Sequence, residues 1–371
     1  MTDFPRANWR LTLIPFSWLY GLVVWIRNAL YDNGLLKATG FNLPVISVGN
    51  ITVGGTGKTP HVEYLVDLLG GEYRVATLSR GYRRRTRDFR LAGDGSTAGE
   101  VGDEPLQMKR RFPGIVVAVD RKRVNGITEI MKLTPPVEVI VLDDAYQHRA
   151  VRPGLSILLI DYKRPIKQDL LLPAGMLREP PSNRNRADLI LVTRSPERIK
   201  PIEMREYVNR LGLEMGQHLF FTTIRYDILI PVYREAPGRD RAWFREHAGG
   251  VLIVTGIANP RDLRQFARGI STRVNEMSFP DHHRYTGKDM ERIARRYAEL
   301  STDWKEVLVL TTEKDAMKLR DLDPGRELGK AMYAVRVRVH FLNEDQEEFD
   351  KYIKHYVAGN KRSSILHQAA D

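Results

Sequence analysis

The stretch VGNITVGGTGKTP (residues 48–60) decides the fold of the N-terminal part of this chain. It begins within a short apolar segment, PVISVG (44–49), and leads into HVEYLVDLLGG (61–71), where apolar residues recur at helical spacing. A strand, a glycine-rich loop and a helix in this order are the setting of a phosphate-binding loop. The stretch leaves open whether the bound phosphate drives a switch or is transferred to another molecule.

The glycine-rich loop departs from the strict pattern G-x-x-x-x-G-K-[ST] at its first position, where Thr52 replaces glycine. The later glycines still let successive N–H groups face a phosphate, and the following helix adds its N-terminal dipole. We expect Lys58 to reach the β- and γ-phosphates and Thr59 to ligate Mg²⁺. A glycine turn with a chance lysine is the alternative. The predicted nucleotide-binding residues are Thr52, Val53, Gly54, Gly55, Thr56, Gly57, Lys58 and Thr59.

Apolar strands alternate with helical segments after this loop. Strands are predicted within 74–82, 114–120, 137–148, 155–162 and 187–193. Continuous apolar strands that alternate with helices predict a parallel sheet covered on both faces. A more polar extended segment at 220–233 precedes a second strand–helix series, which predicts a second, smaller α/β domain.

The predicted fold class is therefore α/β, with a P-loop NTPase-type parallel sheet domain, a smaller α/β domain and an N-terminal membrane-associated helix. The predicted boundaries are 1–33 for the N-terminal helix, 34–225 for the P-loop domain, 226–245 for linker strands, 246–345 for the smaller domain, and 346–371 for a C-terminal helix and tail.

Two acids end the apolar segment VEVIVLDDAYQH (137–148). Asp143 and Asp144 thus lie at the carboxyl edge of the sheet, where ligands bind in open α/β folds. One of them is expected to hold Mg²⁺ directly or through water, as in Walker B sites. Capping of the next segment is the alternative.

Three further groups are candidates for the site. Asp103 and Glu104 precede a helix, so their alternative role is helix capping. The loop FPDHHRYTGKD (279–289) offers a histidine that a carboxylate orients, as in general-base relays, with a solvated loop as the alternative. Arg178 belongs to a proline-rich segment, 171–188, that suits a shaped loop with a charge near the site.

The composition narrows the possible partners. The chain of 371 residues contains no cysteine, which excludes disulfides and cysteine-based zinc sites and is compatible with a reducing compartment. A formal net charge of +12 favours an anionic partner such as a phosphorylated substrate or an acidic membrane face. Basic runs such as RGYRRRTR (80–87) lack an accompanying nucleic-acid-binding signature, so no nucleic acid partner is expected.

The N-terminal segment LTLIPFSWLYGLVVWI (11–26) is uncharged and lies between Arg10 and Arg27. It falls short of the roughly 20 residues that a spanning helix needs, and its aromatic residues favour a membrane interface. We expect a helix that lies in one leaflet on the cytosolic side. A buried core helix is the alternative. A signal peptide is a weaker interpretation, because no small-x-small cleavage site follows closely.

Seven blocks carry a family resemblance in order from 49 to 319: GNITVGGTGKTP, LSRGYRR, VGDEP, LDDAYQHR, LPAGMLREP, FPDHHRY and TTEKDAMKL. Together they resemble the tetraacyldisaccharide 4′-kinase family over most of the chain. The family often has D-D-G-[FY]-Q-H in the fourth block, so Ala145 is a small departure.

The resemblance implies transfer of the γ-phosphate of ATP, with Mg²⁺, to the 4′-hydroxyl of a tetraacylated glucosamine disaccharide 1-phosphate, which gives lipid IVA. It implies a peripheral or monotopic enzyme on the cytoplasmic face of the inner membrane, in contact with an anionic membrane surface. It implies that Asp103 is the base, with His282 hydrogen-bonded to it or sharing the proton, and with Asp281 orienting the histidine. The substrate-binding residues that it assigns are Asn50, Arg80, Glu104, His148 and Arg178.

Two other classes of protein remain as alternatives. A P-loop NTPase that acts as an assembly or metal-insertion switch would read guanine through [NT]-K-x-D, but TTEKD (311–315) has the order T-x-K-D. A membrane-bound lipid-binding protein with a vestigial loop would not need the intact Lys58 and Thr59.

Overall fold

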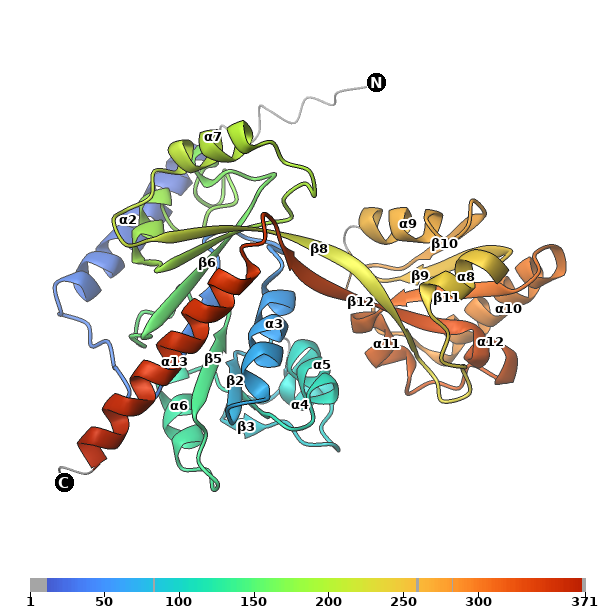
Figure 1. Cartoon of the computed structure of the whole chain (residues 1–371), viewed down its shortest axis with the longest axis horizontal. Coiled ribbons are helices and arrows are strands. Elements are labelled where there is room, and N and C mark those ends of the chain that lie inside the picture. The colour runs from blue at the N-terminus through green and yellow to red at the C-terminus, as the bar shows by residue number, and fades with distance from the viewer. Residues whose placement is uncertain (1–11, 83, 258–259, 282, 369–371) are drawn as a thin grey trace. The chain divides into compact units, whose positions relative to one another are not determined.

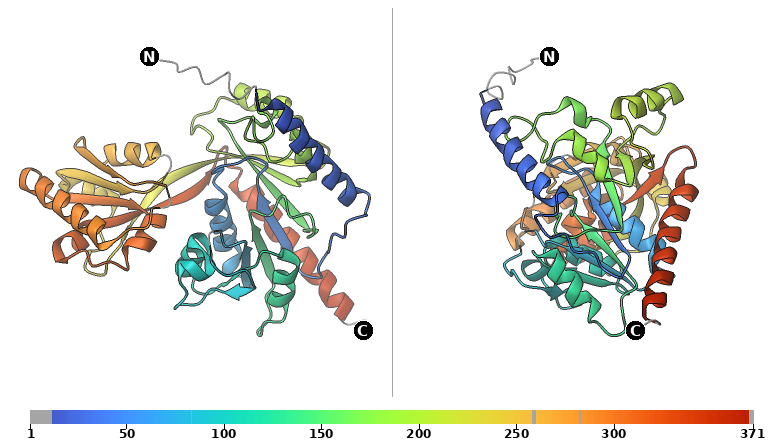
Figure 2. Two further views of the ribbon diagram at one scale, coloured as in Figure 1. Left: turned by 180° about the vertical axis from the view of Figure 1, so that it is seen from behind. Right: turned by 90° about the vertical axis from the view of Figure 1, so that its left-hand side faces the viewer.

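The computed structural model of the chain describes residues 12–82, 84–257, 260–281 and 283–368, and only the backbone for 361–368. The chain divides into two compact units (Figures 1 and 2). Unit 1 comprises Met1–Ile224 together with Val339–Asp371, and unit 2 comprises Arg225–Arg338.

Unit 1 contains a mostly parallel sheet with the strand order β8-β7-β6-β1-β5-β2-β4-β3. Within it, β3 pairs antiparallel with β4. The predicted parallel sheet is thereby confirmed, and the P-loop strand β1 lies between β5 and β6. The strands are β1 (Val45–Gly49), β2 (Val75–Ser79), β3 (Arg90–Leu91), β4 (Val116–Val119), β5 (Val139–Asp143), β6 (Leu155–Asp161), β7 (Leu189–Thr193) and β8 (His218–Pro231).

The central strands β1, β5, β6 and β7 of unit 1 are buried at every position, and most of their residues are apolar. In β1, Ile46 and Val48 join the core under α3, α5 and α13, whereas Val45 joins the core under α6. This alternation explains why these strands read as unbroken apolar runs. The helical segments are α2 (Ile14–Asp32), α3 (Lys58–Gly70), α4 (Ala98–Val101), α5 (Asp103–Arg111), α6 (Arg123–Met131), η1 (Ile166–Gln168), η2 (Pro181–Arg186), α7 (Pro201–Leu211) and α13 (Gln346–Gln368).

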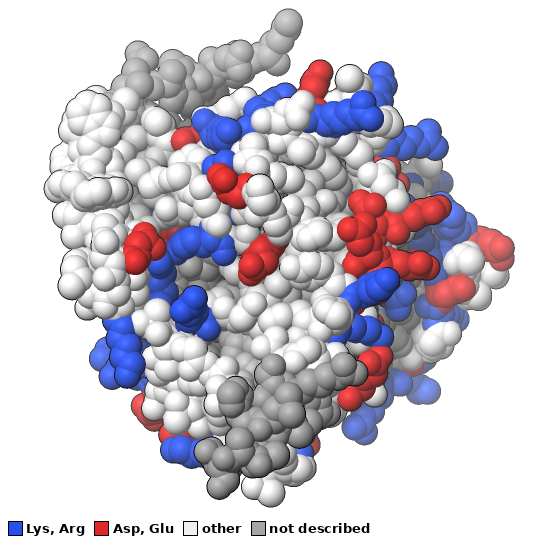
Figure 3. Space-filling model, turned by 60° about the vertical axis from the view of Figure 1, so that its left-hand side comes forward, with Lys and Arg blue, Asp and Glu red and all other residues white. Residues whose placement is uncertain are grey.

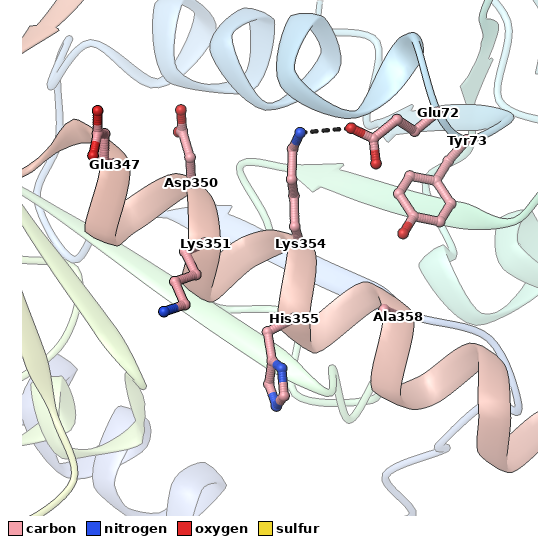
Figure 4. A pocket seen from close by; sticks show the side chains of 8 residues that line it. All are labelled: Glu72, Tyr73, Glu347, Asp350, Lys351, Lys354, His355 and Ala358. Carbon is pink, nitrogen blue, oxygen red and sulfur yellow. Dashed lines mark hydrogen bonds and ion pairs between the residues drawn. The ribbon is translucent and has the colours of Figure 1, made fainter.

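Helix α13 packs beside the P-loop helix α3. Phe349, Ile353 and Val357 of α13 are buried in the core that α3 also lines. The Tyr64 hydroxyl donates to Asp350 Oδ1 at 2.6 Å, and Lys354 pairs with Glu72 at 2.6 Å beside an open surface groove (Figure 4). The C-terminal helix therefore helps to hold α3 in place.

Unit 2 has a parallel sheet with the strand order β10-β9-β11-β12. Leu252 and Val254 of β9 face the core that contains α10, α11 and α12, and Val251 and Ile253 face the core that contains α8 and α9. The elements are α8 (Arg241–His247), β9 (Gly250–Thr255), α9 (Arg261–Arg268), β10 (Val274–Ser278), α10 (Gly287–Asp303), β11 (Val307–Thr312), α11 (Glu313–Leu319), α12 (Arg326–Ala331) and β12 (Met332–Phe341).

The observed division of the chain differs from the boundaries expected from the sequence. The chain enters unit 2 within β8 and returns to unit 1 within β12, so each of these strands has residues in both units. In unit 1 the Leu342 N–H donates to the Phe221 carbonyl at 2.9 Å. Residues 339–371 join unit 1 because the apolar side of α13 is buried against α3. No local sequence pattern predicts this tertiary contact.

Candidate active site

The glycine-rich loop connects β1 to α3 at the carboxyl edge of the sheet in unit 1. Gly54 (φ 97°) and Gly57 (φ 83°) adopt left-handed conformations that disfavour other residues, and Gly57 is the N-cap of α3. Lys58 and Thr59 are the first two residues of that helix. The loop and the start of α3 therefore bring backbone N–H groups, a helix N-terminus, an ammonium and a hydroxyl close together in the chain.

Hydrogen bonds from several segments hold the loop in shape. The Asn50 side-chain amide donates to Thr56 Oγ1 at 2.9 Å, and the Val53 N–H donates to the Met176 carbonyl at 2.7 Å. Thr193, at the end of β7, donates its hydroxyl to the Thr56 carbonyl at 2.9 Å. Thr52 is buried in place of the usual first glycine. The predicted nucleotide-binding residues thus lie in one loop and in the first turn of α3.

His61 supports this loop and was missed by the sequence analysis. Its Nδ1 lies 2.7 Å from the Gly57 carbonyl oxygen and its Nε2 3.0 Å from Thr222 Oγ1. Because a carbonyl oxygen only accepts, Nδ1 carries the proton. Burial lowers the pKa of His61 to about 4, so the ring is neutral at pH 7. In the sequence, His61 occupies a helix position like those of ordinary core residues, so no local pattern indicated its contact with the loop.

Asp143 and Asp144 have different environments although they are adjacent. Asp143 is buried, and its Oδ1 has no hydrogen-bond partner among the described residues. Burial, with the neighbouring carboxylates of Glu104 and Asp144, raises the pKa of Asp143 to about 7 against the opposing charges of Lys58 and Arg123. This unpartnered buried oxygen suits a cation.

Asp144 is held by two cations at the mouth of the site. Its Oδ1 lies 3.3 Å from Lys58 Nζ and 3.4 Å from Arg178 Nη1. Burial raises its pKa, but Lys58 and Arg178 outweigh burial and leave the pKa below its ordinary value. The structure therefore brings together Lys58, the acid pair and Arg178, all four of which the sequence analysis placed at the site. The left-handed backbone of Asp144 (φ 48°) marks local strain at this position.

Arg123 is a second residue that the sequence analysis missed. Its guanidinium is buried and donates to the Asp143 carbonyl at 3.2 Å and the Asp120 carbonyl at 2.5 Å. Burial lowers the pKa of Arg123 to about 10, which still leaves it charged at pH 7. His148 is the next basic group: burial, then the charges of Arg123 and Arg80, lower its pKa to about 4. His148 is therefore neutral at pH 7 in a cationic surrounding.

Asp103 and Glu104 begin helix α5, on the same edge of the sheet. Gly102, with φ 98°, is the N-cap residue, so Asp103 occupies the first helical position and does not serve as the N-cap. A Cβ atom on Gly102 would lie 3.2 Å from backbone atoms of Gly81 and Tyr82, which is tighter than an ordinary contact, so the loop at 80–82 and the start of α5 are packed closely. Glu104 is near enough to Asp143 to raise its pKa.

The DHHR loop lies in unit 2. Asp281 is exposed, and His282 falls outside the described residues. His283 Nε2 lies 3.1 Å from Asp289 Oδ2, and its ring stacks on Phe279. The carboxylate that orients His283 is therefore Asp289. Asp103 belongs to unit 1 and Asp281 to unit 2, so their cooperation stays a prediction.

Helix α2 contacts the loops of the site through polar groups. The Tyr20 hydroxyl donates to the Arg178 carbonyl at 2.9 Å, and Arg27 donates to the Gln147 carbonyl at 2.5 Å. Gln147 in turn donates to the Asn50 carbonyl at 2.7 Å. Within the described part of the chain, no helix has the length and apolarity to cross a membrane.

Comparisons with known proteins agree with this arrangement. The family model for tetraacyldisaccharide-1-P 4′-kinase matches residues 9–358. The chain is 44% identical over 355 residues to the tetraacyldisaccharide 4′-kinase of Phocaeicola vulgatus, covering 95% of this chain and 96% of that protein. It is 43% identical over 360 residues to that of Bacteroides thetaiotaomicron, covering 95% and 94%. Among solved structures, it resembles LpxK from Aquifex aeolicus in complex with ATP, with a TM-score of 0.73, 31% identity and coverage of 94% and 99%.

Proposed function

This chain belongs to the tetraacyldisaccharide 4′-kinase family and transfers the γ-phosphate of ATP to the 4′-hydroxyl of tetraacyldisaccharide 1-phosphate, and we propose which residues perform that transfer. The observation that carries the proposal is the meeting of Lys58, Asp144 and the unpartnered oxygen of Asp143 beside the phosphate loop. Phosphoryl transfer needs positioning and charge neutralisation at this point.

We propose Thr59, Asp143 and Asp144 as the residues that hold Mg²⁺ with the nucleotide. The unpartnered oxygen of Asp143 and the half-buried Thr59 hydroxyl group are hard oxygen donors of the kind that this ion prefers. Among the described residues, no group of three or more Asp, Glu, His or Cys side chains is placed so that it could hold a metal ion by itself. That finding agrees with an ion that takes most ligands from phosphates and water. The ion would neutralise charge on the β- and γ-phosphates.

Asp103 is the proposed base for the sugar hydroxyl. Its place at the start of α5, beside Glu104 and on the edge of the sheet where the phosphate loop lies, supports that role. His282 is proposed to share or accept the proton, with Asp281 orienting it. A sugar hydroxyl is a poor nucleophile, so a positioned proton acceptor accelerates its attack.

The proposed acceptor-binding residues surround the same loops. Arg178 and Arg80 supply positive charge for an anionic glycolipid, and Arg178 is already oriented by Asp144. His148 is neutral at pH 7, so it serves as a hydrogen-bonding group rather than as a cation. Asn50 and Glu104 complete the proposed set.

The structure also argues against a guanine-reading role for the TTEKD segment, and so against the switch alternative. Asp315 of the TTEKD segment is fully buried. Its Oδ2 accepts hydrogen bonds from Gly256 N–H at 3.0 Å and from the Thr312 hydroxyl at 2.8 Å. These bonds cap α11 and join it to β9, so this carboxylate supports the fold of unit 2.

Acceptor dependence separates a kinase from a switch. We expect ATP consumption to require the disaccharide 1-phosphate and to match the 4′-phosphorylated product one to one. An acceptor without the 4′-hydroxyl serves as the control and should give neither product nor ATP turnover. Rapid ATP or GTP hydrolysis at the same rate with and without the acceptor would favour the switch.

We propose that α2 lies in the surface of an anionic membrane on the cytoplasmic face of the inner membrane. Its distribution of side chains is the reverse of a helix on a water-facing surface: polar Ser17 and Asn28 are buried, while Trp18 and Trp25 are 74% and 63% exposed. Figure 3 shows an uncharged area below the N-terminal grey atoms, on the side where α2 lies. Exposed apolar patches of this kind mark contact with a membrane or a protein. The other exposed large apolar residues of α2 are Phe16, Leu19, Leu22, Val23 and Ile26.

Replacing Trp18 and Trp25 with glutamine tests the membrane role without removing the polar contacts of α2. Loss of about 50 Å² of apolar contact per side chain, at about 25 cal/mol per Å², lowers vesicle affinity roughly tenfold for each. We expect the double variant to lose about 100-fold in binding to anionic vesicles, measured by co-sedimentation. ATP affinity and the rate on detergent-dispersed acceptor should stay unchanged.

Met215→Gln is the matched control because Met215 is a fully exposed apolar side chain elsewhere in unit 1. It should bind vesicles like the unaltered protein. A folded Trp18/Trp25 double variant that still sediments fully with vesicles would refute the proposed membrane contact.

A further inference from the structure

A buried carboxylate joins the P-loop helix to the helix that begins with the proposed base. Glu63 of α3 is 2% exposed, and its two oxygens contact two residues of α5. Gln107 Nε2 donates to Glu63 Oε1 at 3.0 Å, and Arg111 Nη1 lies 2.5 Å from Glu63 Oε2. Breaking a buried pair of this kind is costly, because the remaining charge keeps its desolvation penalty.

Helix periodicity links this contact to both ends of the reaction. Gln107 and Arg111 lie four and eight residues after Asp103, so the three share one face of α5. Glu63 lies four residues after Thr59 and shares its face of α3. Glu63 therefore connects the face of α3 that carries the proposed metal-ligating hydroxyl of Thr59 to the face of α5 that carries the proposed base, Asp103.

A second contact leaves the start of α5 little freedom. Gly102 packs on the backbone of Gly81, and a Cβ atom at position 102 would lie only 3.2 Å from it. That contact holds the N-terminus of α5 to the loop after β2, and the Glu63 contacts hold its later turns to α3. Two attachments on a nine-residue helix fix both its position and its rotation.

We infer that Glu63 is a positioning residue that sets the place of Asp103 relative to the phosphate loop. The inference rests on the proposed role of Asp103 as the base. Glu63 is proposed to contact neither nucleotide nor acceptor, and to act through its contacts with Gln107 and Arg111 of α5. A displacement of about 1 Å between reacting groups is enough to reduce a rate about 10²-fold, so the contact matters for turnover before it matters for nucleotide binding.

Glu63→Gln, alone and combined with Asp103→Asn, tests the inference. The amide cannot pair with the Arg111 charge, so α5 should shift. We expect kcat to fall about 10- to 100-fold while ATP affinity, measured by titration, changes less than about twofold. In the Asp103→Asn background the same substitution should cost less than about twofold, because no base remains to be displaced.

Arg111→Lys provides a second route if Glu63→Gln does not fold. Lysine keeps the charge but lacks the planar fork, so a smaller fall in kcat and the same dependence on Asp103 are expected. Glu129→Gln, which removes a surface ion pair with Lys132 on α6, is the matched control and should leave kcat unchanged.

Three results would overturn the inference: an unchanged kcat in folded Glu63→Gln, an equal loss in both backgrounds, or a parallel loss of ATP affinity. Each differs from failure of the proposed base. That failure would appear as a normal kcat in the Asp103→Asn single variant.

Discussion

Lys58→Ala is expected to lower kcat on the lipid acceptor by about 10²–10³-fold. Loss of one preorganised charge that follows the transferring phosphoryl group typically has an effect of this size. Lys58 lies at the N-terminus of α3, and its Nζ is 3.3 Å from Asp144. The substitution therefore removes a contact to phosphate and also leaves Asp144 with Arg178 as its remaining described cationic partner. Single-turnover kinetics with saturating ATP, Mg²⁺ and acceptor measure the effect.

Two comparisons isolate the role of the Lys58 charge. Lys132→Ala removes an exposed lysine of a surface ion pair and should not change kcat. Thr59→Ala should instead raise the Mg²⁺ concentration needed for half-maximal rate, because it removes a proposed ligand of the ion. The assignment of the phosphate loop is wrong if Lys58→Ala keeps a kcat close to that of the unaltered enzyme.

Asp103→Asn should lower kcat by about 10²–10⁴-fold and leave the melting temperature and ATP affinity nearly intact. Proton transfer to a positioned base contributes about this much to such reactions. The amide has almost the same shape but cannot accept the proton. The rate on the acceptor, thermal unfolding and ATP titration together separate chemistry from folding.

The competing role for Asp103 is stabilisation of the helix. A carboxylate in the first turn of α5 interacts with the helix dipole, and its loss typically costs about 0.3–1 kcal/mol. A normal kcat with a lowered melting temperature would support that role and exclude the base. Asp94→Asn, on an exposed turn before α4, is a matched control with the same change of charge and should alter neither quantity.

The strands of the sheet and the phosphate loop were predictable because their signals are local. The strand β1, the glycines and the helix α3 are consecutive, so their sequence contains the whole strand–loop–helix geometry. Asp143 was also predictable, since the end of an apolar parallel strand lies at the ligand-binding edge. The ordered motifs then carried the family resemblance, which the comparisons confirm.

Residues that act through neighbours distant in sequence could not be found in this way. His61, Arg123 and Glu63 match ordinary helix positions, and their roles depend on Thr222, Asp143 and Arg111, which other segments bring to them. The return of β12 and α13 to unit 1 is likewise a matter of packing between remote segments.

The uncharged N-terminal segment shows the boundary between the two kinds of information. Its residues favoured a membrane-associated helix and left a core helix as the alternative, because both require apolar side chains. The face that a helix buries depends on its tertiary neighbours. Ser17 and Tyr20 form hydrogen bonds with the loop at 171–178, so the polar side of α2 turns inward and Trp18 and Trp25 remain outside. Helical propensity and hydrophobicity were properties of the segment, whereas its orientation was set by hydrogen-bond partners more than 150 residues away.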